Sequence, residues 1–137
     1  MDDRETLLSN DKLTLWYLPR SGMLWHEVHE WACGEPYREM LETGLSCMKK
    51  HGLSKWLSDN RNNNALPPDD ERWIHHDWFP RTLAAGWTHW AVVPPVKVFG
   101  EKNMRRYASR YETFGLTTMM FAEPVEARAW LDEQDAP

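Results

Sequence analysis

The chain has 137 residues, a formal net charge of −5 and nine tryptophans. This length suffices for one domain, 1–137, to bury a core without covalent or metal staples. An acidic chain lacks the broad basic face that nucleic acids require, so we expect no nucleic-acid partner. Cys33 and Cys47 are too few for a disulfide scaffold or a zinc finger, and we interpret both as reduced thiols.

The N-terminal segment also bears on localisation. Its first residues, MDDRETLLSNDKL, are acidic where a secretory signal needs a basic segment and then an apolar one. No apolar run approaches the ~20 residues that cross a bilayer. We therefore expect no membrane span and a cytoplasmic location.

The N-terminal third has the alternating pattern of β-strands. Leu24, His26 and Val28 share one face of such a strand, and Met23 and Trp25 share the other. Turn-forming residues separate the segments. The pattern predicts strands at residues 5–9, 13–18 and 23–31.

From residue 34 onward, helical and strand patterns alternate. Helices are predicted over residues 34–51, 69–86 and 98–114 and from 124 onward, and strands over 55–58, 87–93 and 116–121. Pro80 must kink or split the second helix, because proline lacks a backbone donor. Crossovers of this length imply parallel pairing of the strands they join.

These elements predict an α/β domain. We expect a mixed, mostly parallel sheet of five to six strands, with helices packed mainly on one face. Such a sheet leaves an apolar second face. Trp16, Trp25 and Trp31 belong to the N-terminal strands and would suit burial of that face in a homodimer.

Three segments carry a resemblance to a known superfamily. They are KWLSDNRNNNALP (55–67), DWFPRTLAAGWTHWAVVPP (77–95) and EPVEARAWL (123–131). The chain resembles the STAS-like proteins, which include the anti-sigma factor antagonists and are related to the CRAL-TRIO lipid-binding fold. More narrowly, it is similar to a bacterial branch for which no activity is established. The resemblance thus implies a fold and leaves the role open.

In the anti-sigma factor antagonists, a phosphorylatable serine begins the helix after a central strand, and its phosphate blocks a partner. This chain departs from that pattern, since it has no Ser or Thr between Ser58 and Thr82. The acidic triplet at 69–71 could imitate a phosphate. The attraction of carboxylates to a helix N-terminus explains the triplet more simply.

The loop after the strand at 55–58 is the first candidate site. Sites in open α/β sheets lie beyond the carboxyl ends of the strands. Asp59, Arg61, Asn62 and Asn64 would offer donors and acceptors there to a polar ligand or a protein partner. These side chains could instead hold their own loop, because Asn and Asp readily bond nearby backbone.

An aromatic cluster is the second candidate. Trp78 lies among several aromatic residues around the proline-bearing helix, with Arg81 one turn later. An apolar pocket with a few polar groups is the usual form of a small-molecule site. A tryptophan-rich core or dimer interface would produce the same cluster.

Familiar catalytic patterns do not occur. The chain has no G-x-S-x-G, P-loop or dinucleotide motif. His75 and His76 are adjacent, so on a helix they diverge by about 100° and do not form a zinc pair. We therefore expect no catalytic residues, no metal and no cofactor.

Two functions remain as hypotheses. The first is a non-enzymatic STAS-like regulatory or interaction module that binds a protein partner, or itself, through the loop at 59–69 and the helix that follows it. The alternative is a carrier or sensor of a small apolar or amphipathic ligand in a tryptophan-lined pocket.

Overall fold

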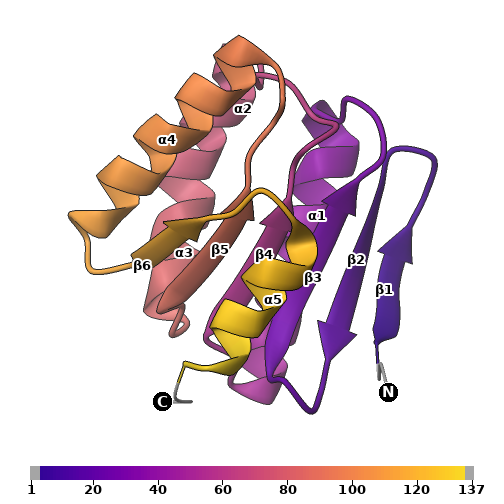
Figure 1. Ribbon diagram of the computed structural model, residues 1–137, viewed down its shortest axis with the longest axis vertical. Helices are drawn as coiled ribbons and strands as arrows, with labels where there is room; N and C mark the ends of the chain where they lie inside the picture. The colour runs from indigo at the N-terminus through magenta and orange to yellow at the C-terminus, as the bar shows by residue number, and fades with distance from the viewer. Residues whose placement is uncertain (1–3, 135–137) are drawn as a thin grey trace.

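The computed structural model describes residues 4–134, apart from the side chains of residues 98 and 99. Within this range six strands form one sheet in the order β1-β2-β3-β4-β5-β6 (Figure 1). They are β1 (Glu5–Ser9), β2 (Leu13–Leu18), β3 (Met23–Val28), β4 (Lys55–Asp59), β5 (His89–Val93) and β6 (Thr117–Met120). Two pairings, β1–β2 and β2–β3, are antiparallel, and the three from β3 to β6 are parallel. The predicted α/β architecture with a mixed sheet is confirmed.

Most helices lie on one face of the sheet. They are α1 (Gly34–His51), α2 (Pro68–Trp73), the π-helical segment η1 (Ile74–Trp78), α3 (Phe79–Ala84) and α4 (Val98–Glu112). The helix α5 (Pro124–Asp132) packs on the opposite face against β4 and β5. In Figure 1, α5 lies on the near side of the sheet, with α1 and α3 behind it.

The alternation of side chains along each strand divides the interior in two. On β4, Trp56 belongs to the large apolar cluster under the helical layer, whereas Leu57 belongs to the smaller cluster under α5. The same alternation places Ser58 with Trp56, and Asp59 with Leu57. Neighbouring residues of this strand therefore face different layers.

The helical region after β4 contains one π-helical turn just before Pro80. Its segments α2, η1 and α3 follow one another directly, and the N–H of Phe79 reaches back to the carbonyl of Ile74. Pro80 has no N–H to donate, and its ring crowds the preceding turn. The predicted disturbance at Pro80 thus takes the form of a π-helical turn, which directs Ile74 and Trp78 into the core.

Element ends differ slightly from the sequence prediction. The third strand ends at Val28, not at Trp31, because the chain leaves the sheet there. After it, the backbone N–H of His29 bonds the carbonyl of Lys12, and that of Ala32 bonds Asn63. None of the described helices is both long and apolar enough to span a membrane.

Asp70 joins α2 to the start of α1. Its carboxylate accepts the N–H of Gly34 at 2.8 Å and Nε of Arg38 at 2.9 Å. The side chain of Asp70 is 4% exposed, whereas that of its neighbour Asp69 is 81% exposed. Asp70 therefore stabilises the N-terminus of α1 in addition to lying in the first turn of α2. The acidic triplet in the sequence did not predict this contact with α1.

We expect Asp70→Ala to lower the free energy of unfolding by about 2 kcal/mol, because it leaves the half-buried N–H of Gly34 and the guanidinium of Arg38 without their acceptor. Asp69→Ala, the matched control in the same triplet, should change it by less than about 0.5 kcal/mol. Urea denaturation of both variants measures the difference. Equal effects would contradict the role of Asp70 between the helices.

Candidate functional site

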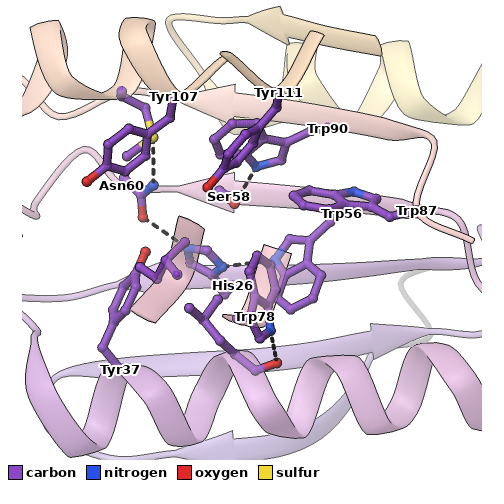
Figure 2. Close-up of a pocket in the computed structure, with 13 residues that line it drawn as sticks. His26, Tyr37, Trp56, Ser58, Asn60, Trp78, Trp87, Trp90, Tyr107 and Tyr111 are labelled. Carbon is purple, nitrogen blue, oxygen red and sulfur yellow. Dashed lines mark hydrogen bonds between the residues drawn. The ribbon is translucent and has the colours of Figure 1, made fainter. Parts of the chain in front are cut away.

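A small cavity lies between the sheet and the helical layer. Its volume is about 30 Å³, enough for one water molecule and too little for a lipid. Six aromatic side chains form most of its wall, namely those of Trp56, Trp78, Trp87, Trp90, Tyr107 and Tyr111. Four residues with polar groups, His26, Tyr37, Ser58 and Asn60, and three apolar ones, Leu41, Ile74 and Met104, complete the lining. Figure 2 shows these side chains pointing into the same space from opposite walls.

A chain of hydrogen bonds crosses one wall of this cavity. Nε1 of Trp56 donates to Nδ1 of His26 at 3.0 Å. Nε2 of His26 lies 2.9 Å from Oδ1 of Asn60, and Nδ2 of Asn60 lies 3.9 Å from the sulfur of Met104 (Figure 2). Trp56, His26 and Asn60 are all buried, so this chain of hydrogen bonds has no access to bulk solvent.

The tautomer of His26 follows from its partners. An indole nitrogen can only donate, so Nδ1 of His26 must be the acceptor. The ring proton then sits on Nε2 and is donated to Asn60. Protonating Nδ1 would turn two N–H groups toward each other. Burial lowers the pKa of His26 from 6.5 to about 4, although Asn60 and Asp59 oppose the fall. His26 is therefore neutral at pH 7, with both ring nitrogens occupied.

The tryptophans of the wall are held rigidly. Nε1 of Trp78 donates to the carbonyl of Leu41 at 2.9 Å, and Nε1 of Trp90 donates to Oγ of Ser58 at 2.8 Å. The rings of Trp56 and Trp78 meet edge to face, with centroids 5.4 Å apart. These contacts fix the shape of the inner wall.

An open groove adjoins the cavity on the outside. It has a volume of about 440 Å³ and is lined by Glu71, His75, Arg106, Tyr107 and Arg110. Tyr107 lines both spaces. Its hydroxyl donates to Oε2 of Glu71 at 2.9 Å, and its ring packs edge-on against His75 with centroids 4.6 Å apart. Tyr107 thus forms the partition between the groove and the cavity.

The pKa values of two groups at this partition, Tyr107 and His75, are shifted toward the neutral forms. Burial raises the pKa of Tyr107 far above its ordinary value, and Glu71 adds to the rise. Burial also lowers the pKa of His75, and the nearby charge of Arg110 lowers it further. Nδ1 of His75 lies 2.9 Å from the hydroxyl of Tyr111. Tyr107 and His75 are therefore both neutral at pH 7.

The structure places Asp59 and Arg61 away from this cavity. Asp59 faces the α5 side of the sheet, and its carboxylate accepts Nε and Nη2 of Arg61, both at 3.1 Å. Nη1 of Arg61 also pairs with Glu123 at 3.1 Å. These contacts fasten the loop after β4 to the start of α5. The residue of this loop that does line the cavity is Asn60, which was not among the candidates.

The asparagine run has an inward and an outward part. Asn63 is buried, and its Oδ1 accepts the backbone N–H of Ala32 at 3.0 Å. Asn64 bonds the N–H of Ala65 next to it, and Asn62 is exposed. The asparagines therefore bond the backbone of their own loop and of the segment after β3. This agrees with the alternative that these side chains hold the loop in place.

We expect Asn63→Ala to lower the free energy of unfolding by about 1–2 kcal/mol, because the buried N–H of Ala32 would lose its acceptor. Asn62→Ala, the exposed neighbour, should stay within about 0.5 kcal/mol of the wild type. Thermal or urea denaturation compares the two variants. A larger loss of unfolding free energy in Asn62→Ala than in Asn63→Ala would contradict the assignment of Asn63 as the buried residue that holds the loop.

Trp78 and Arg81 are separated, although they lie on the same helix. Trp78 is buried in the cavity wall. Arg81 lies at the surface, where it pairs with Asp77 at 2.8 Å and with Glu42 of α1 at 2.8 Å. The six residues that the sequence suggested thus fall into separate groups, and only Trp78 lines the cavity.

The cavity residues that were missed did leave a signal in the sequence. Trp56 and Ser58 on β4 and Asn60 directly after it follow a period of two, so two polar groups continue the face of a buried strand. His26 lies between Leu24 and Val28 on a strand face in the same way. Buried polar groups at apolar positions need partners, and this requirement points to a shared site.

Comparison of the chain with protein-family models, with curated proteins and with solved structures gives no significant match. The resemblance to STAS-like proteins therefore stays a prediction.

Proposed function

We propose that this protein binds a small, largely apolar molecule in the tryptophan-lined cavity, as a carrier or sensor that does not transform it. The observation that carries the proposal is the convergence of His26, Tyr37, Ser58 and Asn60 on a space walled by aromatic rings. An apolar pocket with a few convergent polar groups is the common form of small-molecule sites. Since the cavity has a volume of only about 30 Å³, binding of a larger molecule requires side chains of its wall to move, and Tyr107 at the partition is the one that also lines the groove.

The state of His26 supports binding without chemistry. Both ring nitrogens are occupied, one by Trp56 and one by Asn60. A general base needs a nitrogen that can reach the substrate and a pKa near the working pH. The lowered pKa of His26, about 4, and its two bonds suit an orienting role.

Native mass spectrometry of the protein purified from its host tests this proposal. We expect the native mass to exceed the denatured mass by one small molecule. Leu41→Phe enlarges a side chain that lines the cavity and should abolish the difference. Leu83→Phe, the same change at a half-buried position outside the cavity lining, should preserve it. Equal native and denatured masses in the wild type would contradict the proposal.

A protein-interaction module is the second candidate, and the loop at 59–69 supports it less than the sequence suggested. Of its asparagines, Asn60 and Asn63 are buried. Three large apolar residues near the carboxyl ends of the strands are instead exposed, Trp31 by 51%, Val96 by 79% and Val125 by 73%. Exposed apolar side chains at one end of a sheet favour a partner surface there.

The second face of the sheet favours self-association as one form of this candidate. The helix α5 contacts β4 and β5, while Trp16 and Trp25 of β2 and β3 lie half-buried beside it, under the guanidinium of Arg4. Among the described residues, Nε1 of Trp25 is the buried side-chain nitrogen without a hydrogen-bond acceptor. Light scattering at micromolar concentration tests this form. A homodimer would support it, and a mass of 16.2 kDa would count against it.

A further inference from the structure

The polar wall of the cavity presents hydrogen-bond donors. Oδ1 of Asn60 must face His26, because the ring proton of His26 is on Nε2. A flipped amide would set two donors against each other. Nδ2 of Asn60 therefore points along the wall, where its described partner is only the sulfur of Met104, a weak acceptor. Asn60 offers the cavity an N–H and no oxygen.

Two hydroxyl groups add to this donor set. Oγ of Ser58 accepts the indole N–H of Trp90, and no described acceptor takes the proton of Ser58 itself. No described residue forms a hydrogen bond with the hydroxyl of Tyr37. Figure 2 shows the side chains of Tyr37, Ser58 and Asn60 around the same space. An oxygen atom in the cavity would face these donors, whereas a donor group would leave the N–H of Asn60 unpaired.

The accepting atom must be uncharged. The lining contains no carboxylate, lysine or arginine side chain, and His26 is neutral with both nitrogens occupied. A buried anion would lack a counter-ion, and a buried ammonium group would meet donors. A carbonyl oxygen satisfies both conditions. A single water molecule satisfies them too, and the closed cavity has the volume for one.

We infer that the cavity recognises the carbonyl oxygen of a small, flat, uncharged aldehyde, ketone or amide, and that the ligand enters through the groove as Tyr107 swings out. This inference rests on the proposed function and specifies its ligand. The oxygen then lies among Tyr37, Ser58 and Asn60. The apolar body of the ligand lies among the tryptophan rings, in space that Tyr107 now fills.

Four probes that share one phenyl ring test this inference. They are acetophenone, a ketone; ethylbenzene, which has no polar atom; 1-phenylethylamine, a cationic donor; and benzoate, an anion. The indole N–H signals of the wild type report binding in ¹H–¹⁵N NMR titrations. We expect acetophenone to bind about tenfold more tightly than ethylbenzene, because it gains hydrogen bonds to the donors. The two charged probes should bind more weakly than acetophenone.

Variants separate the donors from the aromatic wall. Tyr37→Phe removes a hydroxyl without a described partner, so it should fold normally and lose about threefold or more of the preference for acetophenone. Asn60→Asp keeps Oδ1 for His26 but replaces the donor, and should lower the preference further. Asn62→Asp makes the same change at an exposed position and should leave it intact. Tyr107→Ala opens the partition and should bind both acetophenone and ethylbenzene more tightly than the wild type.

The outcomes distinguish this inference from the proposal beneath it. Equal affinities for acetophenone and ethylbenzene, or tighter binding of 1-phenylethylamine or benzoate, would overturn the carbonyl assignment and leave pocket binding in place. Weaker binding by Tyr107→Ala would overturn the entry route. If no probe shifts an indole signal, even in folded Tyr107→Ala, pocket binding itself is overturned.

Discussion

Gly44→Ala should destabilise this protein by about 3 kcal/mol or more, although alanine is the better helix former. Gly44 lies in the buried side of α1, directly over the ring of Trp56. A Cβ added at Gly44 would come within 2.9 Å of Cζ2 and Cζ3 of Trp56, and closer still to Cη2. The ring cannot retreat, because Trp78 and Trp87 pack against it at centroid distances of 5.4 and 6.0 Å.

A second substitution shows whether this clash is the cause. Trp56→Phe shortens the ring that meets Gly44, so Gly44→Ala should cost much less in that background than in the wild type. Ser46→Ala, at an exposed position of the same helix, should stay within about 0.5 kcal/mol of the wild type. Urea denaturation of the double-mutant cycle measures the coupling. Additive effects would mean that the two residues do not press on each other.

The second large effect that we expect is a loss of stability at acid pH, caused by protonation of His26. The pKa of His26 is about 4 in the folded protein, against an ordinary 6.5. Between these pH values the unfolded chain holds more protons, so the free energy of unfolding falls as the pH is lowered from 6.5 to 4. The contribution of neutral His26 is fully present above pH 6.5. It amounts to about 3 kcal/mol, since one pKa unit corresponds to about 1.4 kcal/mol.

His26→Gln isolates this contribution. The amide oxygen can still accept from Trp56, but the side chain does not titrate. The variant should be less stable than the wild type at pH 7 and should lose less stability on acidification. Burial also lowers the pKa of His75 and of His89, which act in the same direction in both proteins. Urea denaturation at pH 7 and at pH 4.5 gives the comparison, and parallel losses in both proteins would contradict the assignment to His26.

The order of elements could be predicted from the sequence because each depends on neighbouring residues. Alternation within residues 13–18 indicates a strand on its own, and the spacing from Tyr37 to Met48 indicates a helix on its own. Pro80 likewise signals a disturbed helix wherever that helix packs. Such local patterns survive folding, so the boundaries of these elements lie close to their predicted places.

The site was harder to predict, because its bonds join distant residues. His26 and Trp56 lie 30 positions apart, and no local pattern pairs them. In the sequence, Gly44 is only a residue of low helix propensity. The structure shows that the ring of Trp56 packs against it and leaves no room for a side chain. Asn62 and Asn63 are the same residue type in the same loop, and only the position of Ala32 tells them apart. Each of these facts depends on which elements become neighbours in the fold.

The strand order has a consequence for how the chain is completed during synthesis. Each strand pairs with the strand before it in the sequence, so none has to be inserted between two that are already paired. The sheet can therefore grow as the chain leaves the ribosome, starting from the meander of β1 to β3. Tyr107 and Tyr111 emerge with α4, after every other cavity residue. The cavity is thus closed late in synthesis, once α4 has docked.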